Sequence, residues 1–320
     1  MTDAAISLPE TQHPRDRWLY AILLLALAFR TYHLAYPFWD YFASRQTFNL
    51  MVAREFTRGN LDLTRPQVAW LVADQTDRPS YFLGEFPLIH ALAAGIWRVL
   101  PLGDWCARLV VIALSLAGLL WLYSLTYRLL GRDAARFAAL AWGVLPFSVF
   151  FGRAFMSDIP ALSLSVGSLD AFVCWLESRS RLQLLLAGAL GALALLTKPT
   201  VIGFGLPMIF LAALEFRWKL PTQPRLYLLG FGIVFPAYLW LGHVQQLARA
   251  GGPEVIGLGL VGHSLGLWLT SATWHEQLER LMHMTLGPLF PSGFPGNSIT
   301  ALSSNGLASK PFSIPASLCP

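Results

Sequence analysis

Long apolar runs separated by short polar connections dominate this chain. A helix needs about 20 apolar residues to cross the hydrocarbon core of a membrane. Runs of this kind occupy residues 18–36, 105–127, 134–151, 158–176, 182–197, 199–216 and 226–248, and a weaker one occupies 255–274. The pattern predicts an all-α polytopic membrane protein with about seven or eight transmembrane helices.

The apolar segment 86–101 does not fit this series. It is sixteen residues long, contains Arg98 and is stopped by Pro101. A run of this length with an internal charge is typical of an interfacial or re-entrant helix. We predict that it does not cross the membrane.

Composition agrees with a membrane protein and excludes several other classes. Only 13% of residues are charged and the mean hydropathy is +0.52, whereas a soluble domain carries about 25% charged residues. This excludes an ordinary soluble protein, a disordered chain and a nucleic-acid binder, and the net charge of +5 fits cationic membrane loops. The three cysteines have no close spacing that would indicate a disulfide framework or a metal motif.

Lysine and arginine residues predict the orientation of the helices, because cytoplasmic loops carry an excess of them. With the N-terminus inside and 86–101 not crossing, the short outer connections hold only Arg153, Lys198 and Arg249. The inner connections hold Arg15, Arg17, Arg128, Arg132, Arg136, Arg179, Arg181, Arg217, Lys219 and Arg225. We therefore expect a cytoplasmic N-terminus, with loop 37–85, the turn at 152–158, Lys198 and the stretch after His243 on the outer face.

These patterns divide the chain into four parts. Residues 1–17 form a cytoplasmic tail, and 18–250 form a transmembrane module whose first outer loop is 37–85. We expect a further membrane or interfacial segment at 251–290 and a polar, poorly packed tail at 291–320, which is rich in Ser, Pro and Gly.

The first outer loop is long for a connection and contains an amphipathic helix pattern. Phe48, Met51, Val52 and Phe56 follow one another at helical spacing, whereas Arg45 lies one turn from Asn49 on another face. The helix either lies on the membrane surface or forms a roof over a site that opens to the bilayer.

Acidic residues mark both boundaries of this loop. Asp40 follows the first crossing helix, and Glu85 lies where the chain returns to the membrane. Partial desolvation suits such a carboxylate to work as a general base or a metal ligand. The alternative is an interfacial carboxylate paired with a loop arginine.

Other charged residues lie at or inside the predicted helices. Asp158, two residues before Pro160, is either an N-cap or a functional acid on the outer face. Lys198 could neutralise a phosphate or extend to lipid head groups. Arg30 and Asp170 lie inside crossing helices and need partners within the bundle.

The sequence contains no phosphate-binding glycine loop, HExxH or GxSxG motif. We therefore expect no nucleotide cofactor, and any transfer reaction must use a donor that is already activated.

The order of motifs resembles glycosyltransferase family 39 of the GT-C superfamily, which includes protein O-mannosyltransferases and the bacterial aminoarabinose transferase. The resemblance covers roughly residues 18–250 and depends on the segments Ala53–Phe56, Glu85–Leu88, Arg153–Pro160 and Leu196–Lys198. It implies a GT-C-type helical bundle in the bacterial inner (plasma) membrane, with the active site on the outer face. It also implies a polyprenyl-phosphate-sugar donor, an extracytoplasmic acceptor and contact with membrane lipid.

The resemblance also suggests roles for individual residues. Asp158 matches the family's second-loop aspartate, and Lys198 matches a conserved-motif lysine. Glu85 matches a glutamate that can bind a divalent metal together with a histidine, here His243. The sequence departs from the family where Arg45-Gln46 stands in place of an acidic pair and Phe86 in place of a lysine.

From residues and resemblance together, we expect an inverting transferase of a hexosyl or pentosyl type. Asp40 or Asp158 is the expected base, and Lys198 is expected to bind the donor phosphate with help from Arg45, Arg153 or Arg249. The alternatives are a non-catalytic transporter or lipid-binding scaffold, and an inactive truncated transferase.

Overall fold

A computed structural model of the chain describes residues 16–38, 42–59, 61–68, 80–82, 84–99 and 103–249. Of the residues considered above, Asp40 lies outside the described ranges, as do the weak apolar run at 255–274 and the parts 251–290 and 291–320. For Arg249, only the backbone is described.

Helices account for nearly all regular structure in the described part of the chain. They are α1 (Arg17–Thr31), α2 (Ala43–Arg58), α3 (Leu88–Val99), α4 (Cys106–Leu130), α5 (Arg132–Val144), α6 (Pro146–Phe151), α7 (Asp158–Ser178), α8 (Arg181–Thr197), η1 (Pro199–Phe204), α9 (Gly205–Phe216), η2 (Arg217–Thr222) and α10 (Pro224–Arg249). Two short strands, β1 (Gln67–Val68) and β2 (Ser80–Tyr81), pair antiparallel with Gln67 opposite Tyr81.

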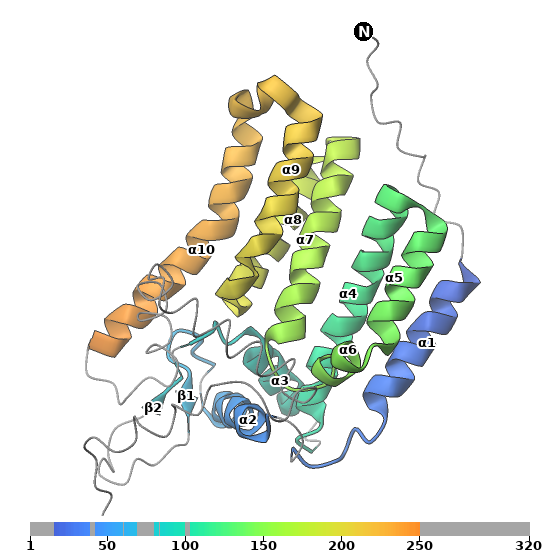
Figure 1. Ribbon diagram of the computed structural model, residues 1–320. Coiled ribbons are helices and arrows are strands. Elements are labelled where there is room, and N and C mark those ends of the chain that lie inside the picture. The colour runs from blue at the N-terminus through green and yellow to red at the C-terminus, as the bar shows by residue number, and fades with distance from the viewer. Residues whose placement is uncertain are drawn as a thin grey trace, which may run out of the picture. The chain divides into compact units, whose positions relative to one another are not determined.

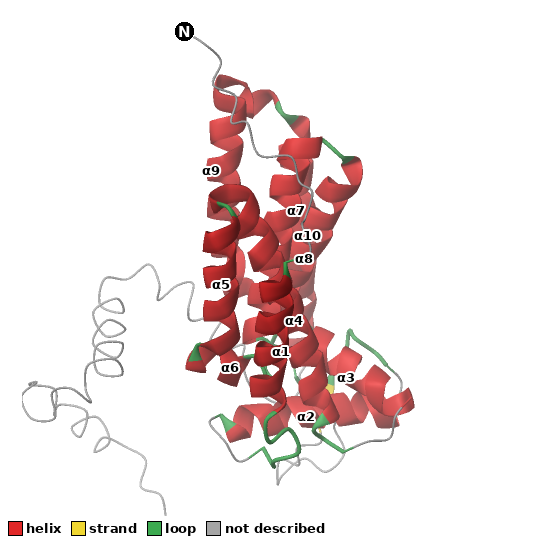
Figure 2. Ribbon diagram, turned by 90° about the vertical axis from the view of Figure 1, so that its right-hand side faces the viewer, coloured by secondary structure: helices red, strands yellow, loops and turns green. Residues whose placement is uncertain are grey.

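The longer helices run side by side as a bundle, and α2 lies across one end of it with α3 and the strands nearby (Figures 1 and 2). We call this the site end; it also holds the turn at 152–157 and Lys198. The other end, the basic end, holds the connections between α4 and α5, between α7 and α8, and between α9 and α10 (Figure 1). The described residues among those predicted to share the outer face are therefore gathered at one end.

All seven strongly apolar runs are helical, and the predicted all-α polytopic membrane fold is confirmed. Within the described residues, α4, α7, α10 and the continuous stretch Pro199–Thr222 are each long and apolar enough to cross a membrane. Helices α1 and α8 are shorter. The total of seven or eight crossings stays a prediction.

Several predicted boundaries are wrong. The run at 134–151 is two helices, α5 and α6, separated at Leu145, because Pro146 has no N–H to continue the hydrogen-bond ladder of α5. The first helix ends at Thr31 rather than at residue 36. The run beginning at residue 199 opens as a 3-10 helix before α9.

Helix α3 lies within the segment predicted to be interfacial. At about 1.5 Å per residue its 12 residues extend only about 18 Å, well short of the hydrocarbon core. Leu50 and Ala53 of α2 share a buried cluster with Ile89 and Ala93 of α3. This cluster also contains Val110 of α4, so it fixes the amphipathic helix predicted in loop 37–85 to the bundle.

Small residues bring α4 and α7 into close contact. A Cβ atom on Gly118 would lie 2.7 Å from the Ser163 Cβ, and one on Gly167 would lie 2.7 Å from the Trp121 ring. Membrane helices use such residues to let their backbones approach. Glycine at these two positions thus sets the spacing between the central helices.

Buried Arg30 finds its partners in backbone carbonyls and hydroxyls. Its guanidinium donates to the carbonyls of Trp142 and Gly143, where α5 ends, and to Ser115 Oγ and Ser148 Oγ. The last carbonyls of a helix have no partner within it and carry a partial negative charge. Arg30 therefore satisfies the break before Pro146 and holds α1 against α4 and α6.

The other intramembrane charge, Asp170, lies 3.7 Å from Arg128 Nε, and Arg128 also pairs with Glu177. At the start of α1, Asp16 binds Arg136 with both oxygens and accepts from Tyr123 Oη at 2.8 Å. The contacts of Arg128 join α4 to α7, and those between Asp16 and Arg136 join the start of α1 to α5. Both lie near the basic end.

Candidate active site

Four separate segments bring charged side chains together at the site end. Arg45 comes from the first turn of α2, and Glu85 comes from the segment before α3. Asp158 begins α7, directly after Ser157, and Lys198 directly follows α8. We call Arg45, Glu85, Ser157, Asp158 and Lys198 the ion-pair cluster.

The members of the cluster contact one another in sequence. Lys198 Nζ donates to Asp158 Oδ1, and Arg45 Nη1 lies 3.8 Å from Asp158 Oδ2. Arg45 Nη2 donates to Glu85 Oε1 at 3.1 Å, and Ser157 Oγ donates to Glu85 Oε2. Two cations thus alternate with two carboxylates, and the cluster is neutral overall.

Access to the cluster is partial. The exposed fractions of the Lys198 and Glu85 side chains are 18% and 19%, against 31% for Asp158 and 43% for Arg45. Asp158 Oδ2 is shielded and accepts no hydrogen bond from the described residues. A substrate that reaches the cluster would therefore meet partly desolvated charges.

Local backbone structure places Lys198 beside Asp158. The residue before a proline avoids the helical conformation, and Lys198, which precedes Pro199, is extended with φ −158° and ψ 104°. The break ends α8 and directs the chain into η1. The chain therefore leaves α8 at Lys198, beside Asp158, the first residue of α7.

Two amide side chains of α2 hold the turn that precedes Asp158. Gln46 Oε1 accepts from the Phe155 N–H at 3.2 Å, and Asn49 Nδ2 donates to the Phe155 carbonyl at 2.8 Å. Both amides are buried. They fix the 152–157 turn against the helix that carries Arg45, a positioning role that sequence reasoning missed. The available signal was the polar pair, three residues apart, in a helix with an apolar face.

The segment that carries Glu85 is held from the other side. The Phe86 N–H donates to the Leu196 carbonyl at 3.0 Å, and Trp240 Nε1 donates to the Gly84 carbonyl at 3.3 Å. The rings of Phe86 and Trp240 meet edge to face, with centroids 5.0 Å apart. Helices α8 and α10 therefore position Glu85.

The structure decides between some of the alternatives for these residues. Helix α7 begins at Asp158 itself, with Ser157 at the N-cap and no side-chain cap, so the N-cap interpretation of Asp158 is wrong. Lys198 Nζ donates to Asp158 Oδ1, and its binding to a phosphate or to lipid head groups stays a prediction. Glu85 is paired with a loop arginine, as its alternative interpretation expected.

The remaining predicted base and phosphate-binding residues are Arg153, Arg249 and Asp40. Arg153 Nη1 donates to the Tyr32 carbonyl at 2.6 Å. Arg249 ends α10, and Asp40 is outside the described residues. Their proposed roles stay predictions.

Glu85 and His243, the predicted metal pair, each have other protein partners in the structure. Both oxygens of Glu85 have protein partners, and His243 Nε2 lies 2.9 Å from the Thr64 carbonyl. No group of three His, Cys, Asp or Glu side chains suited to a metal ion occurs within the described ranges. Metal binding by this pair stays a prediction that chelation of the purified protein would test.

His90 is a second histidine near the site, and the structure places it in the core. It is fully buried between the rings of Phe82 and Phe155, at centroid distances of 5.6 and 5.8 Å. Burial lowers the pKa of His90 to about 3. The imidazole is therefore uncharged at neutral pH and packs as an aromatic ring.

The described residues form a helical membrane bundle with a partly buried cluster of acidic and basic side chains at one end, an arrangement consistent with a membrane-embedded enzyme. The chain matches the family described as dolichyl-phosphate-mannose-protein mannosyltransferase over residues 77–241 and belongs to that family. The matched region includes Glu85, Asp158 and Lys198, whereas Arg45 precedes it and His243 follows it. No curated protein matches the chain, and no solved structure does.

Proposed function

We propose that the protein transfers a sugar from a polyprenyl-phosphate carrier to an extracytoplasmic hydroxyl group on a lipid, glycan or protein. The observation that carries this proposal is the contact between Asp158 and Lys198 at the end of the bundle. It places a candidate base beside a candidate phosphate ligand, within the region that matches the family.

The proposed reaction is a single displacement at the anomeric carbon. Asp158 takes the proton from the acceptor hydroxyl as that oxygen attacks, and the bond between the anomeric carbon and the phosphate oxygen breaks. The electron pair of this bond leaves with polyprenyl phosphate, whose charge Lys198 and Arg45 neutralise. Attack from the side opposite the phosphate inverts the anomeric configuration.

Two further parts of the proposal concern residues near the site. Asp40 is retained as the alternative base, and Arg153 and Arg249 are retained as additional phosphate ligands. A positioned general base contributes about 10²- to 10⁴-fold to the rate, so loss of the correct one should reduce turnover by that factor.

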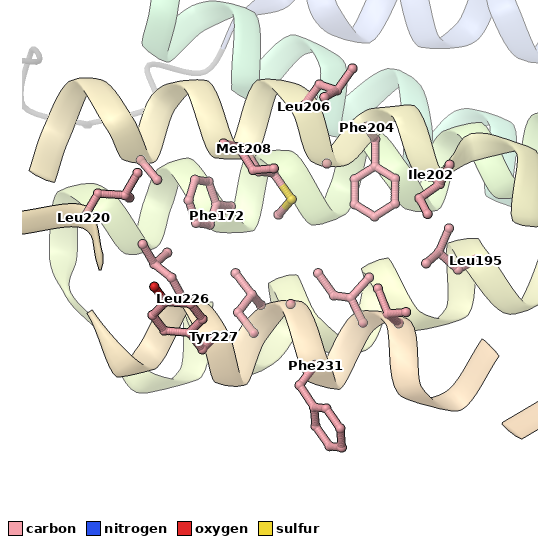
Figure 3. Close-up of a pocket in the computed structure, with 17 residues that line it drawn as sticks. Phe172, Leu195, Ile202, Phe204, Leu206, Met208, Leu220, Leu226, Tyr227 and Phe231 are labelled. Atoms are coloured by element: carbon pink, nitrogen blue, oxygen red, sulfur yellow. The ribbon is translucent and has the colours of Figure 1, made fainter. Parts of the chain in front are cut away.

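An apolar groove offers a place for the polyprenyl chain. It lies between α9 and α10 and has a volume of about 710 Å³. Phe204 of η1 and Met208 of α9 line it on one side, and Leu226 of α10 lies on the opposite wall (Figure 3). One lining residue, Leu195, is three positions before Lys198. A carrier with its chain in this groove could place its phosphate at the cluster.

The proposal sets the site end on the outer face of the bacterial inner membrane and the N-terminus in the cytoplasm. The arginine residues at the basic end support this orientation, since cytoplasmic connections are enriched in positive charge.

The test is consumption of a defined donor. Purified protein in proteoliposomes is supplied with undecaprenyl-phosphate-linked hexoses or pentoses, together with membranes from cells that lack the protein as the source of acceptor. We expect one donor to be converted to undecaprenyl phosphate, with the sugar attached to acceptor in the inverted configuration. Binding of every donor without transfer would contradict an enzymatic role and favour a lipid-binding scaffold.

A further inference from the structure

We propose that Asp158 occupies the phosphate-binding position of Lys198 until the donor arrives, and that the donor phosphate frees the base by displacing it. This inference rests on the proposed function and adds a coupling between donor binding and activation of the base. It assigns Lys198 two successive partners, the Asp158 carboxylate and the donor phosphodiester.

The positive charge of Lys198 is paired with a carboxylate, which a phosphate of equal charge can replace. Its Nζ is bound by Asp158 Oδ1, and its side chain is only 18% exposed. Removing a counterion from a partly buried ammonium group is costly. A sugar-linked polyprenyl phosphate is a phosphodiester with one negative charge, the same charge as a carboxylate. Lys198 therefore exchanges one singly charged anion at its ammonium group for another.

The displaced carboxylate already has a second cation within reach. Arg45 Nη1 lies 3.8 Å from Asp158 Oδ2, an oxygen that accepts no hydrogen bond from the described residues. Arg45 is itself held by Glu85 at 3.1 Å. Rotation of Asp158 toward Arg45 would therefore leave neither Asp158 nor Lys198 buried without a counter-charge.

The exchange has a consequence for catalysis. A carboxylate oxygen bound by an ammonium group is a poor proton acceptor, because it already accepts a charge-assisted hydrogen bond. When the donor phosphate takes Lys198, Oδ1 of Asp158 becomes available for the acceptor hydroxyl. The base would therefore act only on a site that holds the donor.

Competition predicts opposite effects of one substitution on binding and on transfer. In Asp158→Asn the carboxylate no longer competes for Lys198, so phosphate binding should tighten while transfer is lost. Ion pairs that retain some exposure contribute about 0.2–1 kcal/mol, which corresponds to binding up to about fivefold tighter. A residue that merely supported the fold would weaken both.

The experiment is a double-mutant cycle on undecaprenyl phosphate binding, measured in nanodiscs with the full chain. The proteins are the wild type, Asp158→Asn, Lys198→Gln and the double variant, with Asp158→Ala as a second probe. We expect tighter binding in both Asp158 variants, weaker binding in Lys198→Gln, and no effect of Asp158→Asn once Lys198 is replaced. Thermal unfolding verifies that each variant is folded.

Two results overturn different parts of the account. If the wild type binds undecaprenyl phosphate and transfers sugar, but folded Asp158→Asn and Asp158→Ala bind it equally or more weakly, then Asp158 does not compete for Lys198. The exchange is then wrong and the proposed function stands. If the folded wild type neither binds the probe nor consumes donor, the proposed function fails and the exchange fails with it.

Discussion

Arg45 stands where the family resemblance expects an acidic residue, and the structure gives its guanidinium two carboxylate partners. It donates to Glu85 and lies within ion-pair distance of Asp158. An acid at this position would have joined two existing carboxylates and raised the cost of ionising all three. The arginine instead lies between Glu85 and Asp158 and contacts both carboxylates. The proposed mechanism therefore assigns the base to Asp158 and not to the α2 position.

Replacement of Arg45 tests this arrangement. Arg45→Gln removes the cation shared by Glu85 and Asp158 and shifts the groups that meet the substrate, an effect that can cost about 100-fold in rate. We expect transfer to fall by about 10- to 100-fold, measured as sugar transferred per minute. Arg54→Gln is the control, because Arg54 lies on the same helix but pairs with exposed Asp104. Equal activity of the two variants would remove Arg45 from the site.

Asp16 is expected to make stability depend on pH. Hydrogen bonding to Arg136 holds the pKa of Asp16 at about 2, against its usual 3.8. A lowered folded-state pKa contributes stability that is present above pH 4 and lost as the pH falls toward 2. We expect Asp16→Asn to lower the free energy of unfolding by about 1–2 kcal/mol at pH 7, with the difference shrinking below pH 4.

The control for Asp16 is Asp133, which pairs with the same arginine at 3.2 Å but is 96% exposed. Asp133→Asn should change the melting temperature little, because exposed ion pairs contribute little. A difference between Asp16→Asn and wild type that stays constant from pH 7 to pH 2.5 would contradict the ion-pair explanation.

At the scale of elements, hydrophobic periodicity located the helices well but not their internal breaks. Apolar length alone predicts the run at 134–151 as one helix. The break before Pro146 depends on buried Arg30 and Ser148, which donate hydrogen bonds to the last carbonyls of α5. Counting the crossings along the sequence predicts that Asp158, Glu85 and Lys198 lie on the same side of the membrane. Their contacts are not predicted in this way, because these depend on how α7, α8 and the loop before α3 pack together, which a linear pattern does not contain.

The α4–α7 contact is the element whose packing is most directly testable. A methyl group on Gly118 would overlap Ser163, and overpacking of this kind costs about 1–3 kcal/mol. We expect Gly118→Ala to lower the melting temperature in detergent. Gly230→Ala on α10 is the matched control, since a Cβ atom there meets nothing within 4 Å, and it should be neutral or slightly stabilising. Equal stability of both variants would show that α4 and α7 are not closely packed.

At the scale of the whole molecule, the bundle separates its chemistry from its basic residues. The ion-pair cluster lies at the site end, whereas the connections rich in arginine lie at the other (Figure 1). Family membership adds a lipid-linked donor, and the groove between α9 and α10 leads from the level of Lys198 along the bundle. The proposed function therefore requires the site end to face outward.

Cysteine labelling tests this orientation. Thr200 and Thr222 are both exposed and lie near opposite ends of the stretch Pro199–Thr222. In a variant whose three native cysteines are replaced by alanine, a membrane-impermeant thiol reagent on intact cells should label Thr200→Cys and not Thr222→Cys. Permeabilised cells should label both, which verifies that both positions are reactive. The opposite labelling pattern in intact cells would place the cluster in the cytoplasm.

The most direct test of the central claim is the turnover of Asp158→Asn in the transfer assay, compared with wild type and with Asp104→Asn, an exposed acid outside the cluster. If Asp158 is the base of a lipid-linked sugar transferase, its variant should transfer sugar about 10²- to 10⁴-fold more slowly at the same melting temperature, and Asp104→Asn should match the wild type. A folded Asp158→Asn variant with full transfer activity would contradict the account.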